Sequence, residues 1–227
     1  MQLQRRLRES EKSLVVIIAG VEGAGKGEVV DKLNRWFDTR DVKTYAYWDE
    51  TDEESQRPEY WKFWRNLPIK GTIGVMFGSW YTNPIVDAAF GKLSEAELDQ
   101  QLKKISELER TLSDNGTIFV KLWLHLSKSG QKNRLEYDVK VSKLKKSPLL
   151  EKFSKSYGKF AKISERAIRL TDSGHAPWNI IDASDPKYRD ISIGNVIVSA
   201  LQEALPEQDE GSVKNSSAKP VKASDSL

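Results

Sequence analysis

The stretch LVVIIAGVEGAGKGEVV, residues 14–30, joins a continuous apolar run to a glycine-rich segment and then to helix-forming residues. This order predicts a buried strand, a phosphate-binding loop and a helix. Glycines allow successive backbone N–H groups to surround an anion, and a helix N-terminus adds its positive dipole end. The spacing G-x-x-x-x-G-K is complete from Gly20 to Lys26. A tight strand-turn-helix without a ligand is the alternative, but it does not account for a lysine at this spacing.

The loop departs from the usual phosphate-loop pattern at one position. A serine or threonine hydroxyl normally follows the lysine and holds Mg²⁺, whereas this chain has Gly27. The carboxylate of Glu22, inside the loop, is the nearest candidate metal ligand. We therefore expect Lys26 and Glu22 to be the catalytic residues. The remaining loop residues are expected to bind phosphate, namely Gly20, Val21, Gly23, Ala24, Gly25 and Gly27.

Composition sets only loose limits on function. With 227 residues and 38% hydrophobic residues the chain can bury one ordinary core. The formal net charge of +3 neither demands nor excludes a polyanionic partner. The absence of cysteine excludes disulfides, thiolate metal sites and a cysteine nucleophile. No apolar run approaches the roughly 20 residues of a membrane span, so we expect a soluble, cytoplasmic protein without a membrane partner.

The apolar pattern predicts an α/β fold with a parallel sheet. Helical patterns separate the predicted strands, and Ser94 is expected to cap a helix that ends near residue 113. Residues 1–13 are expected to form a short helix or arm, and residues 206–227 a disordered tail without aromatic residues. The predicted domain therefore covers residues 14–205. Its strands are expected at residues 14–19, 42–47, 72–77, 117–126 and 178–181.

Cations alternate with aromatic residues in RPEYWKFWRNLP, residues 57–68. Arg57, Lys62 and Arg65 just beyond a strand end suit a pocket for a nucleotide or for polyphosphate. The alternative is a short core helix whose two tryptophans, Trp61 and Trp64, face the sheet.

Residues 140–155, KVSKLKKSPLLEKFSK, form a lysine-rich segment. In a phosphate-loop protein such a segment can act as a lid that closes over a polyanion. A solvated helix face is the alternative. The lysines that we consider candidates for binding the nucleotide or polyphosphate are Lys143, Lys145 and Lys146.

Five ordered motifs resemble the second family of polyphosphate kinases, phosphate-loop enzymes that move a phosphoryl group between inorganic polyphosphate and a nucleotide. The resemblance covers roughly residues 10–205. The motifs are AGVEGAGKGEVV at residues 19–30, RPEYWKFWRNLPIKG at 57–71, SWY at 79–81, HLSK at 125–128 and APW at 176–178.

The resemblance implies a thymidylate-kinase-like phosphate-loop fold, a three-layer α/β/α sandwich with a lid. It implies that Lys26 and the loop backbone bind phosphate. Glu22 stands where the family has an acidic residue, usually aspartate, near Mg²⁺, and residues 140–155 would correspond to the lid. The implied partners are inorganic polyphosphate and a nucleotide, AMP or ADP, with Mg²⁺ as cofactor. No nucleic acid is expected, and the family implies a homo-oligomer or a second domain of the same kind.

The third predicted strand departs from the family pattern. Phe77-Gly78 stands where the family has Asp-Arg, and Thr82-Asn83 stands where Asn-Arg follows. Mg²⁺ then retains Glu22, water and substrate oxygens, which this metal accepts. Fewer fixed cations are available to meet charge in the transition state. The altered segment FGSWYTNPIVD looks most like the first half of the tandem-domain polyphosphate:AMP phosphotransferases, whereas here there is one domain.

Three functions follow as hypotheses. The first is phosphoryl transfer from polyphosphate to AMP with Mg²⁺, which we favour because the loop is intact. The second is a polyphosphate- or nucleotide-binding domain with weak or no catalysis that assists a second domain. The third is a nucleotide kinase that uses ATP as the donor.

Overall fold

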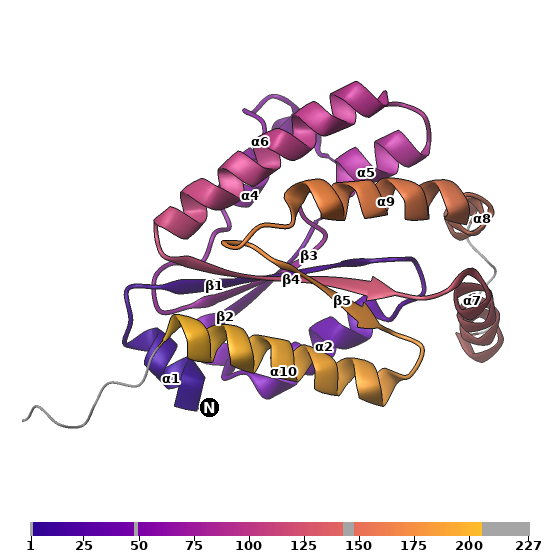
Figure 1. The fold of residues 1–227 in the computed structure, drawn as a ribbon. Helices are drawn as coiled ribbons and strands as arrows, with labels where there is room; N and C mark the ends of the chain where they lie inside the picture. Colours follow the sequence, from indigo (N-terminus) through magenta and orange to yellow (C-terminus); the bar gives the residue numbers. More distant parts are fainter. Residues whose placement is uncertain (1, 48–49, 143–147, 206–227) are drawn as a thin grey trace, which may run out of the picture.

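A computed structural model describes residues 2–47, 50–142 and 148–205 of the protein. At its centre is a five-stranded sheet in the order β2-β3-β1-β4-β5, and all of its strand pairs are parallel (Figure 1). The predicted parallel sheet is therefore confirmed. The strands are β1 Ser13–Gly20, β2 Val42–Ala46, β3 Ile73–Phe77, β4 Thr117–His125 and β5 Trp178–Asp182.

β1 lies in the middle of the sheet because its sequence is apolar on both faces. Residues 13–18 are all buried, and the strand pairs with β3 on one side and β4 on the other. A strand covered on both faces reads as a continuous apolar run, which is the pattern of residues 14–19. This position brings the glycine-rich segment to the carboxyl end of the central strand.

Helices cover both faces of the sheet, so the three-layer α/β/α prediction is confirmed (Figure 1). One layer holds α5 Thr82–Ala89, α6 Glu95–Asp114 and α9 Tyr157–Thr171. The other holds α1 Gln2–Arg8, α2 Lys26–Trp36 and α10 Pro186–Ala204. The predicted Ser94 cap is present as a reciprocal capping box with Glu97. It starts α6, whose apolar residues from Leu98 to Leu112 are buried.

Shorter elements complete the chain: the 3₁₀ turn Thr39–Asp41, α3 Asp52–Ser55, α4 Trp61–Trp64, α7 Lys128–Ser142 and α8 Pro148–Lys155. The predicted lid, residues 140–155, includes the end of α7 and all of α8. A movement of this lid stays a prediction. Lys143, Lys145 and Lys146 lie outside the described residues, as does the predicted tail at residues 206–227.

The start of the chain packs onto the other elements. Leu7 of α1 is fully buried, and the side chain of Gln4 hydrogen-bonds the backbone N–H and C=O of Asp38, each at 2.8 Å. α1 also contacts α10. Residues 2–8 thus form the predicted short helix, while the domain boundary at residue 14 stays a prediction.

The alternative interpretation of residues 57–68 as a core helix is wrong in its detail. α4 exists, but Phe63 is its buried residue, at 6% exposure, while Trp64 is 48% exposed. The Phe63 ring packs against Tyr47 and Trp80 at centroid distances of 4.6 and 5.5 Å. The smaller phenylalanine therefore joins the core, and the tryptophans are left to the surface and its margin.

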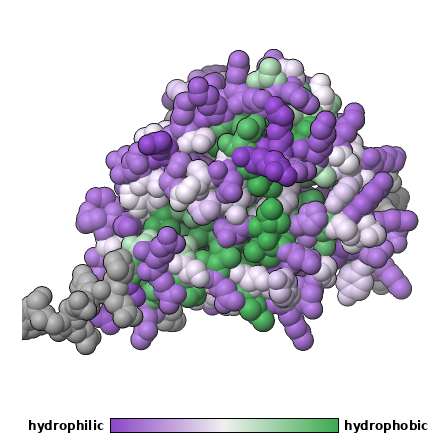
Figure 2. Space-filling model, in the orientation of Figure 1, coloured by the Kyte–Doolittle hydropathy of each residue, from purple (hydrophilic) through white to green (hydrophobic). Residues whose placement is uncertain are grey.

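Apolar side chains also reach the surface at the sheet edge formed by β5. Ile180 of β5 and Ile191 and Val198 of α10 are exposed, and an apolar area lies over these elements in the middle of the face shown in Figure 2.

Among the described residues, no helix has the length and apolar character needed to cross a bilayer. The expected oligomer or second-domain partner stays a prediction.

Candidate functional site

The glycine-rich loop connects β1 to α2 as predicted. Gly20, Gly23 and Gly25 all have positive φ, at 139°, 81° and 79°, a backbone region that side chains disfavour. A Cβ at Gly20 would collide with the backbone carbonyl of Leu124, and one at Gly25 would collide with the Arg189 guanidinium. Two of the predicted phosphate-binding glycines are therefore also needed for close packing against β4 and α10.

Lys26 begins α2, and its side chain folds back over the loop. Its Nζ donates to the carbonyl oxygens of Gly20 and Val21 at 3.4 and 3.1 Å and to Oε2 of Glu22 at 3.0 Å. Its side chain is 17% exposed and that of Glu22 is 37% exposed. The two predicted catalytic residues are thus brought together as an ion pair. A phosphate that enters the loop would compete with Glu22 for the lysine.

The loop region has few ligands for a metal ion. In the described parts of the chain, no group of three or more His, Cys, Asp or Glu side chains is arranged to hold a metal. Glu22 is the single carboxylate of residues 20–27. Mg²⁺ is commonly held by one or two protein carboxylates together with substrate phosphates and water. The donor set therefore fits a metal bound chiefly through the substrate, with Glu22 as its protein ligand.

A buried cation beside the loop was not predicted from the sequence. Arg189 of α10 is 2% exposed, and its Nη1 donates to Oε2 of Glu28 at 3.0 Å and to the Ala24 carbonyl at 3.4 Å. Arg134 of α7 binds the other carboxylate oxygen of Glu28. Glu28 therefore connects the first turn of α2 to α7 and α10. The Arg189 contact spans 161 residues, so no local pattern could have indicated it.

The end of β3 has a backbone that does not suit the family's arginine. Gly78 has a φ of 79°, and a Cβ there would lie 2.9 Å from the carbonyl oxygen of Tyr47. Thr82, at the start of α5, accepts a hydrogen bond from the Ser79 N–H at 3.0 Å and closes this turn. Phe77-Gly78 is thus part of a tight turn that is built around glycine.

Replacing Gly78 with alanine is expected to lower the free energy of unfolding by at least about 2 kcal/mol. About 1 kcal/mol arises from the left-handed backbone and the rest from the contact with the Tyr47 carbonyl. Gly91→Ala is the matched control, because Gly91 has a φ of 77° and open space where a Cβ would lie. Urea unfolding of both variants measures the difference, and equal losses would show that the close contact at Gly78 is unimportant.

A cavity lies beside the turn after β3. Its wall includes the carboxylates Glu50, Glu54 and Glu59, the cation Lys62, the rings of Tyr60, Trp61 and Trp80, and the polar side chains Ser79, Asn83 and Gln101.

Tyr60 is the one non-glycine residue of the described chain with a positive φ, at 66°. Its hydroxyl is buried without a hydrogen-bond partner, and burial raises its pKa. Backbone strain of this kind is often found at ligand sites.

The structure divides the three cations predicted to bind a nucleotide or polyphosphate. Lys62 lines the cavity, is 12% exposed and has its Nζ 3.8 Å from Oε2 of Glu54. The guanidinium groups of Arg57 and Arg65 lie over the Trp61 ring, 5.0 and 5.4 Å from its centroid. The predicted interleaving of cations and aromatic rings is therefore present, and both guanidinium groups lie against the Trp61 ring at the cavity margin.

Two of the quoted motifs meet in a buried polar network behind this cavity. Lys121 of β4 and Glu109 of α6 are both 0% exposed and pair at 2.7 Å. Glu109 accepts from the Trp80 indole N–H at 3.1 Å and from the Tyr81 hydroxyl at 2.8 Å. Burial raises the pKa of Glu109 and lowers that of Lys121, while the ion pair opposes both shifts.

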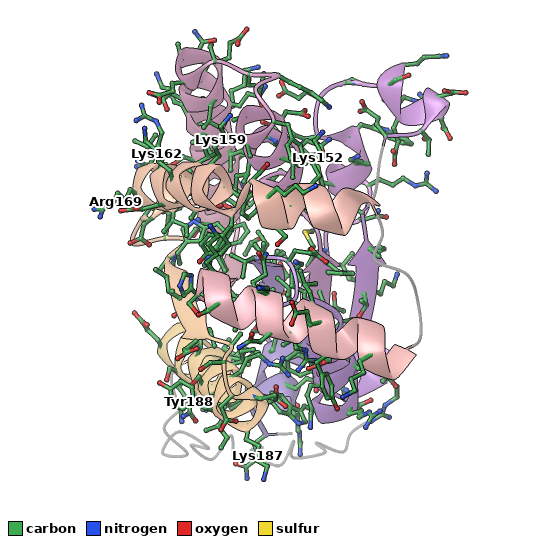
Figure 3. All side chains as sticks on the ribbon, turned by 90° about the vertical axis from the view of Figure 1, so that its right-hand side faces the viewer. Lys152, Lys159, Lys162, Arg169, Lys187 and Tyr188 are labelled. Atoms are coloured by element: carbon green, nitrogen blue, oxygen red, sulfur yellow. The ribbon has the colours of Figure 1, made fainter. Side chains whose placement is uncertain are left out.

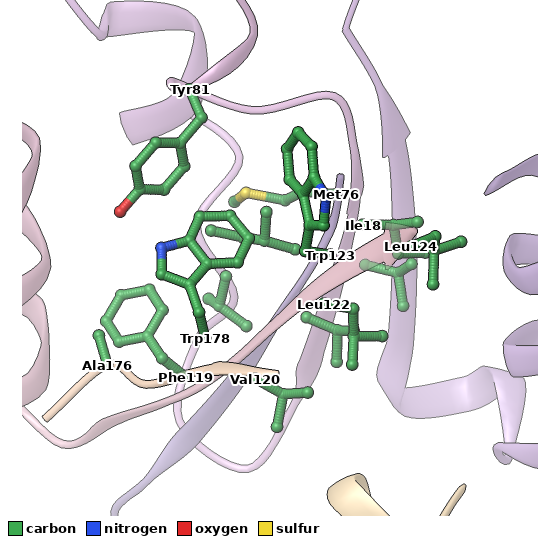
Figure 4. Packing of buried hydrophobic residues seen from close by; sticks show 14 of the residues in the cluster. Ile18, Met76, Tyr81, Phe119, Val120, Leu122, Trp123, Leu124, Ala176 and Trp178 are labelled. Carbon is green, nitrogen blue, oxygen red and sulfur yellow. The ribbon is translucent and has the colours of Figure 1, made fainter. Parts of the chain in front are cut away.

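The same network reaches the segment before β5. Lys121 also donates to the Thr171 carbonyl at 2.9 Å, and its ammonium lies 4.9 Å from the centroid of the Trp178 ring. The Tyr81 and Trp178 rings pack at 4.9 Å (Figure 4). SWY and APW therefore connect the β3 turn to β4, α6, α9 and β5. The signal in the sequence that could have predicted this network is Lys121 itself. A lysine inside the apolar run TIFVKLWLHL needs a buried partner for its charge.

Comparisons with known proteins agree with this geometry. The sequence model of the family described as Polyphosphate kinase 2 matches residues 1–209. A polyphosphate:AMP phosphotransferase of Pseudomonas syringae pv. tomato is 38% identical over 199 residues, which are 87% of this chain and 40% of that protein.

Two crystal structures have the same fold. A polyphosphate kinase 2 from Arthrobacter aurescens TC1 has a TM-score of 0.85 and 28% identity, and the match covers 92% of this chain and 77% of that one. A protein described as a polyphosphate kinase 2 from Pseudomonas aeruginosa PA01 has a TM-score of 0.79 and 35% identity, and the match covers 92% of this chain and 41% of that one.

The chain spans about two fifths of the length of the first curated relatives that it matches. With its phosphate loop, parallel sheet and family-wide match, this chain belongs to the polyphosphate kinase 2 family.

Proposed function

We propose that the chain transfers a phosphoryl group from inorganic polyphosphate to AMP and forms ADP. The observation that carries the proposal is the phosphate loop with Lys26 at its centre. The name of the 38% identical relative, polyphosphate:AMP phosphotransferase, supports the choice of donor and acceptor. The positive φ angles of Gly20, Gly23 and Gly25 give the loop the curved backbone that a phosphate-binding loop needs, which supports phosphate binding at this place.

In the proposed reaction an oxygen of the AMP phosphate attacks the terminal phosphorus of polyphosphate. The bond from that phosphorus to the bridging oxygen breaks, so ADP forms and the polyphosphate becomes one phosphate shorter. Lys26 would leave Glu22 and contact the transferring group, while the loop backbone holds the neighbouring phosphates. Mg²⁺, held by Glu22 and the substrates, would supply positive charge as the group transfers. Most of the rate enhancement would come from alignment and charge neutralisation.

The cavity beyond β3 is the proposed nucleoside site. Its carboxylates and the amides of Asn83 and Gln101 can accept hydrogen bonds from the amino group of adenine, and Trp61 and Tyr60 provide aromatic surface. Its three glutamates oppose entry of a polyanion. This arrangement supports separate sites, with polyphosphate at the loop and the nucleoside at the cavity.

A donor comparison tests the proposal. The purified chain is given AMP and Mg²⁺ with either polyphosphate or ATP, matched for phosphate concentration, and ADP is measured by chromatography. With isotopically labelled AMP, labelled ADP is expected to form faster from polyphosphate than from ATP. Faster formation from ATP would favour the alternative, an ATP-dependent nucleotide kinase.

A second candidate function is ligand binding with little catalysis, in support of another domain. The observation that favours it is Phe77-Gly78, which supplies neither the carboxylate nor the cation found there in the family. It predicts that AMP and polyphosphate bind, as measured by calorimetry, without ADP formation. Turnover by the chain alone, at a rate ordinary for the family, would rule it out.

A further inference from the structure

Two arginines meet one carboxylate beside the phosphate loop. Glu28 lies in the first turn of α2, and its Oε2 accepts from Nη1 of Arg189 at 3.0 Å. Arg134 of α7 binds the other oxygen, Oε1. The side chain of Glu28 is 45% exposed, whereas that of Arg189 is only 3% exposed. A carboxylate in contact with solvent is therefore held by a cation that solvent hardly reaches.

Arg189 comes to the loop from the far end of the chain because of the parallel sheet. β5 and β1 end at the same edge of the sheet, and α10 begins soon after β5 ends. Figure 3, which looks at the end of the molecule toward which β4 and β5 point, shows Lys187 and Tyr188 at the start of α10, next to Arg189 in the chain. The start of α10 thus lies at the edge of the sheet where phosphate is expected to bind.

Both members of the pair touch the loop backbone. Nη1 of Arg189 also donates to the Ala24 carbonyl at 3.4 Å. A Cβ placed on Gly25 would collide with Nη1 and would lie 3.0 Å from Oε2 of Glu28. The glycine at this position therefore lets the ion pair lie directly against the loop.

The position of Glu28 suits the helix but not a polyanion. An acidic side chain in the first turn interacts favourably with the positive end of the helix dipole. A phosphate in the loop uses the same end of α2. An ionised carboxylate beside Gly25 therefore opposes the entry of phosphate unless a cation neutralises it. Both oxygens of Glu28 already accept from arginines, so this carboxylate is a poor candidate ligand for Mg²⁺.

We propose that Arg189 is a positioning residue of the polyphosphate site, which neutralises Glu28 and so allows phosphate groups to occupy the loop. This inference rests on the proposed function and adds to it a residue that acts through Glu28 without touching the substrate. A guanidinium suits this role because it stays charged when buried. Asp190 fixes its other side, accepting from Nε and Nη2 at 3.0 and 2.9 Å.

A charge-rescue experiment tests the proposal. Calorimetry at low and at high salt measures the binding of tripolyphosphate to Arg189→Met, to Glu28→Gln and to the double variant Arg189→Met/Glu28→Gln. Adenosine is the reference ligand, because it is uncharged and its proposed site is the cavity beyond β3. Circular dichroism verifies that each variant folds.

Glu165→Gln is the matched control. It removes the same charge and also frees an arginine, Arg169, from its ion pair. Glu165 lies in α9, in the helix layer on the other face of the sheet from α2 and α10 (Figure 1). This control should leave the affinities for tripolyphosphate and for adenosine unchanged.

Arg189→Met is expected to weaken tripolyphosphate binding by on the order of tenfold at low salt, because Glu28 loses its buried counter-charge. The double variant should regain an affinity close to that of the unmodified chain. Glu28→Gln alone should bind tripolyphosphate about threefold more tightly at low salt, because the two arginines lose their counter-charge. These changes should shrink at high salt, while the affinity for adenosine stays constant.

A double variant that binds as weakly as Arg189→Met would show that the arginine acts on the shape of the loop and not through the charge of Glu28, which overturns the proposal. A Glu28→Gln chain that binds no more tightly than the Glu165→Gln control would overturn it as well, whether or not the Arg189 variants fold. If the unmodified chain does not bind tripolyphosphate, the proposed function fails too; if it binds and Arg189→Met is unchanged, this inference alone fails.

Discussion

Replacement of Lys121 with methionine is expected to lower the free energy of unfolding by about 3 to 5 kcal/mol. The change leaves the Glu109 carboxylate fully buried without its cation, which had been 2.7 Å away. Methionine fills similar volume, so the loss reports the buried charge rather than a cavity. The same change releases the Tyr81 hydroxyl and the Thr171 carbonyl from the lysine. Urea unfolding followed by tryptophan fluorescence measures the effect.

Two controls separate the buried pair from a general effect of removing charge. Lys121→Met/Glu109→Gln removes both charges and keeps an acceptor for Trp80 and Tyr81, so it should regain much of the lost stability. Arg169→Met removes an exposed partner of Glu165 and should change stability far less. If Lys121→Met were as stable as the double variant, the Glu109 carboxylate left without its cation would not be the cause of the lost stability.

Replacement of Lys26 with methionine is expected to reduce the rate of ADP formation by on the order of 10²- to 10³-fold. The variant keeps an apolar stem of similar length, so the expected loss arises from the missing charge. In the structure the ammonium lies over the loop, in contact with the Gly20 and Val21 carbonyls and with Glu22. Rates are measured from AMP and polyphosphate at saturating Mg²⁺.

Lys32→Ala is the matched control for this prediction. Lys32 lies on the same helix and pairs with Asp190 at 3.4 Å, with 46% of its side chain exposed. Its loss should leave the rate close to that of the unmodified chain. A Lys26 variant as active as the Lys32 variant would contradict the role of the loop lysine.

The sequence predicted the parts of the fold that depend on neighbouring residues. The apolar run before the loop, the glycines and the Ser94 capping box each act within a few positions, and each is present in the structure. The choice between Phe63 and the tryptophans as the buried residue depended on the space beside Tyr47 and Trp80, which no local pattern contains.

The candidate site was predicted only in part for the same reason. The loop residues and Lys62 could be named because motif spacing and composition are local. The contacts of Arg189 with Glu28 and of Lys121 with Thr171 join residues that are far apart in the chain. The Phe77-Gly78 departure was visible in the sequence, but the left-handed turn that Gly78 makes against the Tyr47 carbonyl could be seen only in the backbone.

The most direct test of the account is whether this chain by itself makes ADP. Phosphorus NMR can follow purified protein mixed with AMP, polyphosphate and Mg²⁺, with no other protein present. The account predicts that ADP resonances appear as the terminal phosphate of polyphosphate is consumed, at a rate that depends on both substrates. If AMP and polyphosphate both bind and AMP remains unchanged, the claim that this domain catalyses the transfer is contradicted.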